Sequence, residues 1–162
     1  MFLMPMERTS LARALRYLGF RSRSEHEVRE YLRKHGFPDE AIDGTLVKLR
    51  AWGYVDDRRF AKDWVADRLA SGRAGKERLR LELLHRGVSE EIVNEVLAAI
   101  PEERETEAAR AAASRWMERK TGSNLSQEQV RRRLWAYLTR CGYGTEVVSQ
   151  VVRELTGPLA SP

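Results

Sequence analysis

The sequence predicts an all-α protein of extended shape, built from three tandem three-helix units. One observation behind this prediction is a pattern of apolar residues around a glycine that occurs three times, with shifts of 51 and 55 residues between copies. A second is the near absence of strand signals, since no run of alternating β-branched and polar residues occurs. A third is the density of helix start and stop signals. Repeats of this length are typical of tandem structural units, which form long surfaces and favour a macromolecular partner.

The three copies align on their apolar positions, a glycine and a glutamate. In each copy, two apolar residues four positions apart precede the glycine, and a glutamate follows it near the start of the next helix. The aligned glycines are Gly36, Gly87 and Gly142, and the aligned glutamates are Glu40, Glu91 and Glu146. Apolar residues four apart lie on one helix face and make a local core. We interpret the glutamates as favourable charges at helix N-termini.

The first unit shows how each helix begins and ends. Ser24 with Glu27 three residues later has the spacing of a capping box. Gly36 indicates a helix end in the left-handed conformation. Pro38, followed by acidic residues, indicates the start of a helix over 38–50. A further helix over Leu11–Leu18 precedes this pair.

The same signals recur in the other two units. Gly87 ends a helix and Ser89 caps the next, over 89–99; Gly142 ends a helix that follows Ser126 and precedes one over 144–154. The helices before these pairs are expected over Arg59–Leu69 and Thr106–Lys120, the latter in a unit that opens at Pro101. The expected units are residues 9–55, 56–100 and 101–156.

Composition limits the class of protein. The chain has 162 residues, a net charge of +5 and a single cysteine, Cys141, which leaves no internal disulfide and fits a reducing compartment. No apolar run is long enough to span a membrane, and the first residues lack the apolar core of a secretory signal. We therefore expect a cytoplasmic protein.

Charge is unevenly distributed along the chain. Residues 58–86 carry nine Lys/Arg against four Asp/Glu, residues 110–140 carry eight against two, and residues 88–107 carry one against seven. The basic blocks could fold onto one face and bind a polyanion, or they could simply solvate helix faces. The sequence leaves both readings open.

No catalytic or cofactor chemistry is recognisable. His26, His35 and His85 lack metal-ligand spacing, and no phosphate-binding loop is present. Asp56 and Asp57 look like a helix cap and its neighbour. We expect no enzyme activity, no cofactor and no metal site. We interpret Trp52, Trp64, Trp116 and Trp135 as packing residues, not as base-stacking platforms.

The segment Gly53-Tyr54-Val55-Asp56-Asp57-Arg58-Arg59-Phe60-Ala61 resembles the most recognisable string of the RecX family of bacterial recombinase regulators. Flanking residues agree with that family: upstream, Arg21, Arg23, Ser24, Glu27, Val28, Arg29 and Leu32; downstream, Gly72, Lys76, Leu79, Glu82, Leu83, Gly87 and Val88. The resemblance covers about residues 10–155 and is weakest in the third unit. It implies three tandem three-helix repeats in a curved, elongated array.

The resemblance also implies a function. Proteins of this family bind the RecA recombinase, mainly as its filament on single-stranded DNA. They inhibit its ATP hydrolysis, strand exchange and co-protease activity, and so regulate DNA repair, homologous recombination and the SOS response. We expect a monomer that binds the filament, with DNA contacts through basic patches also open. The alternative is a DNA-binding protein that uses helix-turn-helix-like basic units without a recombinase partner.

Basic side chains on the linkers and middle helices are the candidate partner-binding residues. They are Arg21, Arg23, Arg73, Lys76, Arg78, Arg80, Arg131, Arg132 and Arg133. Several alternate with core-facing leucines, which predicts that they point outward. The residues expected to hold the fold are Gly36, Gly53, Tyr54, Asp56, Asp57, Phe60, Ala61, Gly87 and Gly142.

Overall fold

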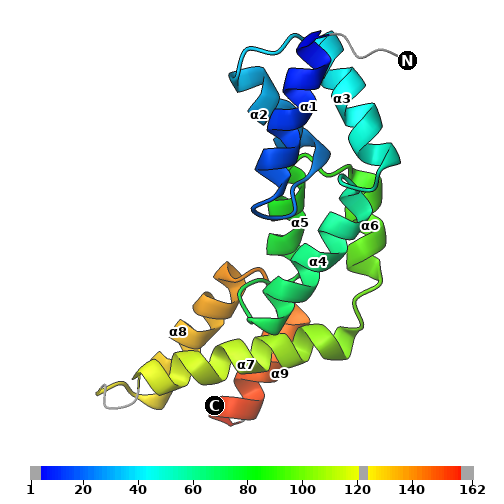
Figure 1. The fold of residues 1–162 in the computed structure, drawn as a ribbon. Coiled ribbons are helices and arrows are strands. Elements are labelled where there is room, and N and C mark those ends of the chain that lie inside the picture. Colours follow the sequence, from blue (N-terminus) through cyan, green and yellow to red (C-terminus); the bar gives the residue numbers. More distant parts are fainter. Residues whose placement is uncertain (1–4, 121–123, 158–162) are drawn as a thin grey trace. The chain divides into compact units, whose positions relative to one another are not determined.

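The computed structural model describes residues 5–120 and 124–157, and within these ranges it contains nine α-helices and no strand (Figure 1). The all-α prediction is therefore confirmed for the described part of the chain. The helices are α1 (Pro5–Leu18), α2 (Glu25–Lys34), α3 (Asp39–Ala51), α4 (Asp57–Ala70), α5 (Lys76–His85), α6 (Glu90–Ala98), α7 (Glu102–Lys120), α8 (Gln127–Arg140) and α9 (Thr145–Thr156).

The predicted helix ends are mostly found where the sequence signals placed them. Ser24 and Ser126 both form complete capping boxes, with Glu27 and Gln129 respectively. Gly36, Gly87 and Gly142 have φ of 81°, 75° and 81°, the left-handed conformation that ends each of these helices. The main difference is α1, which begins at Pro5 and not near Leu11. Proline suits a first helical position, and no apolar periodicity marks that turn.

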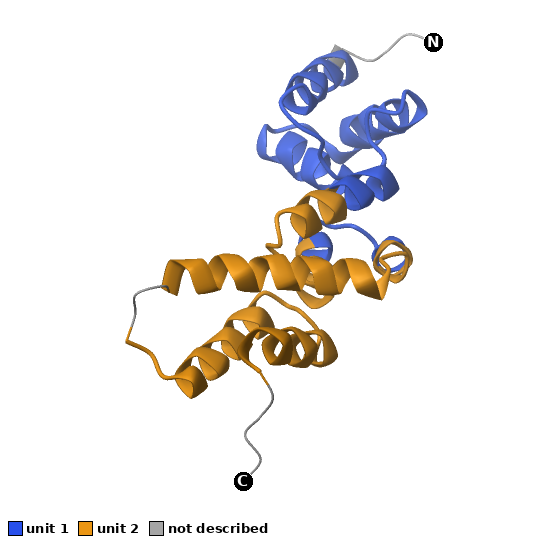
Figure 2. Ribbon diagram, turned by 90° about the horizontal axis from the view of Figure 1, so that it is seen from below, with its two compact units in different colours: residues 1–63, 83–93 blue, residues 64–82, 94–162 orange. Residues whose placement is uncertain are grey.

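The chain divides into two compact units (Figure 2). Unit 1 contains the described residues up to Asp63 together with Leu83–Val93, and unit 2 contains Trp64–Glu82 and the described residues from Asn94 onward. The division cuts α4, α5 and α6, so it does not follow the three expected repeats. The repeat boundaries stay a prediction.

The core of unit 1 lies between α1, α2 and α3, which pack on one another. The buried side chains of this core are Leu11, Ala14, Val28, Leu32, Ile42, Leu46, Leu49 and Val55. At its edge the rings of Tyr17 and Tyr31 stack with centroids 3.9 Å apart. A buried hydrogen bond of 2.6 Å joins the hydroxyls of Ser10 and Thr45, so both polar groups are satisfied.

The core of unit 2 contains α7, α8 and α9, which also pack on one another. The face of α7 that is buried is mostly alanine, at Ala108, Ala109, Ala112 and Ala113. The helices α8 and α9, on which α7 packs, bury larger side chains, including Leu134, Leu138, Val148 and Val151. Small residues opposite large ones let helices approach closely without voids.

The turn at Gly87 packs on the start of α2 within unit 1. The Ser24 hydroxyl donates to the Arg86 carbonyl at 2.5 Å, and the Arg86 guanidinium bonds the Glu27 carboxylate at 2.6 Å. The Glu25 N–H donates to the Asp57 carboxylate at 2.8 Å. A carboxylate from the next predicted repeat thus satisfies the first N–H of α2.

Unit 2 contains an equivalent junction at the start of α5. The Gly75 N–H donates to the Cys141 carbonyl at 2.8 Å, at the positions that correspond to Ser24 and Arg86. The Lys76 N–H donates to the Glu105 carboxylate at 2.9 Å, as Glu25 does to Asp57. The same docking of a glycine turn on a helix start is therefore built twice.

The interpretation of the tryptophans as packing residues is wrong for Trp52, whereas Trp135 is only partly exposed. Trp116 is buried, and Trp64 is partly buried, with its indole N–H bonded to Glu82. Trp52 and Trp135 are 55% and 38% exposed. Trp52 lies at the C-cap of α3, where the chain leaves the helix and its side chain no longer faces the core.

Candidate partner-binding surfaces

Four of the predicted basic residues extend into solvent. Arg132 and Arg133 lie on the outer side of α8, Arg73 lies between α4 and α5, and Arg21 lies between α1 and α2. Arg21 belongs to unit 1 and the other three belong to unit 2. Their exposed charges are accessible to a partner.

Four others bond to the protein itself. Arg23 lies 4.3 Å from the Tyr17 ring centroid and 4.0 Å from the Glu27 carboxylate. Lys76 donates to the Ile100 carbonyl at 3.0 Å, and Arg80 donates to the Asn94 side chain at 2.6 Å. Arg131 donates to the carbonyls of Thr156 and Gly157 at 3.2 and 3.1 Å, and so caps the end of α9.

Arg78 is half exposed and belongs to a network around Glu82. The Glu82 carboxylate accepts hydrogen bonds from Trp64, Arg68 and Arg78. Burial by itself would raise the pKa of Glu82, but the bonds from Arg68, Trp64 and Arg78 outweigh it and lower that pKa. Arg78 bonds to Glu82 on α5 itself, whereas Arg80 bonds to Asn94 in α6 and Lys76 bonds to Ile100 just after α6. The basic residues of α5 therefore lie on two sides of the helix.

The exposed arginines of α8 accompany an exposed aromatic ring. Arg132 precedes Trp135 by three positions, so the two side chains lie on the same side of the helix. Arg119 and Lys120 at the end of α7 are also exposed. This part of unit 2 offers mostly positive charge.

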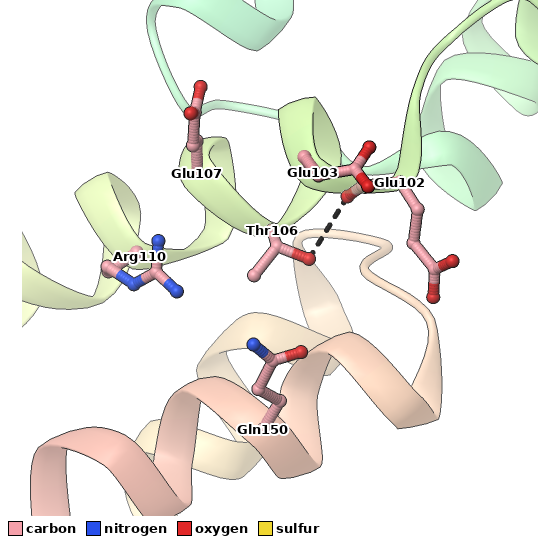
Figure 3. Close-up of a pocket in the computed structure, with 6 residues that line it drawn as sticks. All are labelled: Glu102, Glu103, Thr106, Glu107, Arg110 and Gln150. Atoms are coloured by element: carbon pink, nitrogen blue, oxygen red, sulfur yellow. Dashed lines mark hydrogen bonds between the residues drawn. The ribbon is translucent and has the colours of Figure 1, made fainter.

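A hollow of about 430 Å³ between α7 and α9 offers the opposite charge (Figure 3). It is lined by Glu102, Glu103, Thr106, Glu107, Arg110 and Gln150. Arg110 and Glu154 form two hydrogen bonds of 2.8 and 3.1 Å, which raise the pKa of the arginine and lower that of the carboxylate. The one hydroxyl among these lining side chains, that of Thr106, donates to the Glu102 carbonyl at 3.0 Å.

In the described residues, no group of three His, Cys, Asp or Glu side chains is placed to hold a metal ion. The histidines at 26, 35 and 85 are all exposed. Among the helices described, none is both long enough and apolar enough to cross a membrane.

Asp56 and Asp57 have different roles. Asp56 accepts the Arg59 N–H at 3.0 Å and caps α4, as predicted. Asp57 instead caps α2 through Glu25. The pKa of Asp57 is raised, first by burial and then by the nearby carboxylates of Glu25, Asp56 and Glu27. No local sequence signal indicates this second cap, because it joins residues 32 positions apart.

Comparisons with known proteins identify two three-helix domains in this chain. Residues 11–49 match the model of the first three-helix domain of RecX, and residues 56–97 match that of the second. The chain belongs to the RecX family. Its match to regulatory protein RecX of Prosthecochloris aestuarii is 31% identical and covers 91% of this chain and 94% of the relative.

Other RecX proteins show the range of lengths in the family. Regulatory protein RecX of Mycobacterium avium is 34% identical over 90% of this chain and 84% of its own. The match to regulatory protein RecX of Bacillus licheniformis is 31% identical and covers 88% of this chain, but the chain spans only 53% of that relative's length.

Solved RecX structures share the fold. The crystal structure of RecX from Lactobacillus salivarius superposes with a TM-score of 0.82 at 20% identity, covering 94% of this chain and 98% of the other. A second structure, of regulatory protein RecX, gives 0.78 at 23% identity and covers 90% and 71%. At this identity the likeness establishes the helical fold alone.

Proposed function

We propose that this chain binds the RecA recombinase in its filament on single-stranded DNA and inhibits the ATPase, strand-exchange and co-protease activities of that filament. The observation that carries the proposal is membership of the RecX family of regulatory proteins, which rests on both family-model domains and on near full-length relatives. Such a regulator would act in the cytoplasm, in DNA repair and recombination.

The exposed arginines of unit 2 support an electrostatic contact with the filament. Arg73, Arg132 and Arg133 are exposed to solvent and would meet acidic protein surface or phosphate. Such contacts weaken as salt screens them. Inhibition of RecA should therefore fall as the salt concentration rises.

The test is reversal of Arg73, Arg132 and Arg133 to glutamate, read as inhibition of DNA-dependent ATP hydrolysis by purified RecA. Lys76 and Arg80 were equally attractive from the sequence, but their internal bonds make them poorer choices for reversal. We expect the half-inhibitory concentration to rise at least about tenfold, which corresponds to about 1.4 kcal/mol of binding free energy.

A matched control is reversal of three exposed arginines outside the candidate set, Arg8, Arg16 and Arg104. It changes the net charge by the same amount, so it should leave inhibition within about threefold. Equal loss in both triple variants would show a general charge effect. Full inhibition by the Arg73, Arg132 and Arg133 variant would refute the basic contact and leave an apolar or acidic surface to carry it.

A second candidate function is DNA binding without a recombinase, and the exposed Arg132 and Arg133 on α8 favour it. The third helices of the predicted repeats, α3, α6 and α9, weaken this alternative because they carry few basic residues. α6 contains no lysine or arginine, and α9 contains only Arg153. Binding to duplex DNA in the absence of RecA, lost in the same triple variant that still inhibits RecA, would favour this alternative.

A further inference from the structure

Two large aromatic side chains lie exposed on either side of Gly53, in the turn between α3 and α4. Trp52 and Tyr54 are each 55% exposed. Backbone bonds hold this turn: Gly53 N–H donates to the Arg50 carbonyl at 3.0 Å, and Tyr54 N–H donates to the Leu49 carbonyl at 2.9 Å. The rings are therefore presented to solvent by a rigid backbone.

Cationic side chains surround this turn. The Arg59 guanidinium donates to the Gly53 carbonyl at 2.7 Å, which places a planar cation at the backbone that carries both rings. Arg58 and Lys62 are exposed four positions apart on the first turns of α4, so they share a side of that helix. Arg50, two positions before Trp52, is exposed as well, and its guanidinium bonds the Glu25 carboxylate at 2.8 Å. All of these residues lie in unit 1.

Two of the carboxylates of the same segment, Asp56 and Asp57, bond to helix starts. Asp56 accepts the Arg59 N–H at 3.0 Å, and Asp57 accepts the Glu25 N–H at 2.8 Å. The partial positive charge at a helix N-terminus favours a carboxylate at Asp56, whereas burial and neighbouring carboxylates raise the pKa of Asp57. The turn thus combines two exposed rings with the exposed cations Arg58, Arg59 and Lys62, although Asp63 is exposed beside them.

We propose that Trp52, Tyr54 and the cations around them form a binding surface for single-stranded nucleic acid, with bases stacked on the rings and phosphates contacted by Arg58, Arg59 and Lys62. This combination of exposed aromatic faces and basic side chains is how proteins bind single strands with little sequence preference. A partner that offers carboxylates alone would use the cations but leave both rings uncovered, whereas a single strand supplies phosphates and stacking base faces together. The surface needs no recombinase, so it is independent of the function proposed above.

The test is the affinity of the full chain for a fluorescently labelled 20-nucleotide oligothymidylate at low salt, in the absence of RecA. The variant Trp52→Ala with Tyr54→Ala removes both rings. Stacking contributes at least about 1 kcal/mol per base, so the double variant should bind at least about 30-fold more weakly. Trp52→Phe with Tyr54→Phe keeps two aromatic faces and should bind within about threefold of the parent.

The matched control is Phe20→Ala, which removes a ring that is 83% exposed elsewhere in unit 1. It should leave oligothymidylate binding unchanged. Arg59→Ala should instead reduce the dependence of affinity on salt, because one phosphate contact is lost, whereas the double aromatic variant should keep the salt slope of the parent. Circular dichroism of each variant checks that the helices remain folded.

The proposal is overturned if the parent does not bind oligothymidylate at low salt, or if the double alanine variant binds it with parental affinity. It is also overturned if Phe20→Ala loses as much affinity as the double alanine variant. The same holds if the double alanine variant loses equal affinity for a 20-base-pair duplex, whose base faces are already stacked. A double alanine variant that binds the oligonucleotide normally but no longer binds RecA filaments would assign these rings to a protein contact instead. The triple arginine reversal described above leaves Trp52 and Tyr54 intact, so the two proposals can fail separately.

Discussion

Replacement of Gly142 by alanine measures how strongly the turn between α8 and α9 is held on the start of α5. Gly142 and Gly36 share a φ of 81°, so an alanine at either position is strained to the same degree by the backbone. They differ in surroundings. A Cβ on Gly142 would lie 2.5 Å from both the backbone nitrogen and the Cβ of Arg78, whereas a Cβ on Gly36 would meet nothing within 4 Å.

The magnitude follows from these two environments. A left-handed alanine costs about 1–2 kcal/mol, partly offset by the lower entropy of the unfolded chain, which leaves about 1 kcal/mol for Gly36→Ala. At Gly142 the overlap is with backbone, which cannot rotate away, and overpacking adds about 1–3 kcal/mol. The turn would also move off its bonds, Gly75 N–H to Cys141 at 2.8 Å and Glu77 N–H to Gly142 at 3.1 Å. We expect Gly142→Ala to cost about 3–5 kcal/mol.

The assay is urea unfolding of the full chain, combined with amide hydrogen exchange. Exchange is needed because two compact units need not unfold in one transition. The amides of Gly75 and Glu77 should exchange at least about 30-fold faster in Gly142→Ala than in Gly36→Ala, as a difference of about 2 kcal/mol requires. Equal unfolding free energies for the two variants, with unchanged exchange at Gly75 and Glu77, would refute the docking of this turn.

Three further predictions concern single side chains. Asp57→Ala should cost about 0.5–2 kcal/mol through the lost cap on Glu25, whereas Asp57→Asn keeps an acceptor and should be as stable as the parent or more stable at pH 7. The pKa of Asp57 is raised in the folded state, so its stabilising contribution is complete below its ordinary pKa and is lost as the pH rises through the folded value. The advantage of Asp57→Asn should therefore disappear in unfolding curves measured in acid. The pKa of Glu82 is lowered instead, so its stabilising contribution is present above its ordinary pKa and is lost as the pH falls through the folded value. Glu82→Gln should flatten the plot of unfolding free energy against pH over this range. A plot parallel to that of the parent would contradict the network around Glu82. Arg131→Ala should cost about 1.5–3 kcal/mol of unfolding free energy in chemical denaturation, because the cap on α9 is lost. Arg132→Ala should change that free energy by no more than about 0.5 kcal/mol. The reverse order would show that the two arginines have been assigned to the wrong roles.

The helix ends could be predicted from the sequence because their signals are local. Ser24 and Ser126 lie three residues from the side chains that complete their capping boxes. Gly36, Gly87 and Gly142 each stand where a helix must stop and only glycine takes a positive φ easily. The contacts between predicted repeats could not be found in this way. Nothing in a linear pattern states which N–H a carboxylate such as Asp57 will meet.

The candidate surfaces were harder to predict for a different reason. Alternation with core leucines gives the direction in which an arginine leaves its helix, but not how far its long side chain turns back. Arg131 leaves α8 beside Leu134 and still reaches the end of α9. Conversely, the position of Trp52 near apolar residues suggested burial, although the helix ends one residue before it.

The paired junctions at Gly87 and Gly142 bear on how this protein can be dissected. A fragment cut at the predicted boundary after residue 55 would lose both the carboxylate that caps α2 and the turn that covers Ser24. A fragment beginning at residue 101 would likewise keep the Gly142 turn but lose the Gly75 amide on which it rests. The smallest piece that retains all the bonds of a junction is therefore longer than one repeat, so a design that shuffles these repeats should exchange them in overlapping pairs.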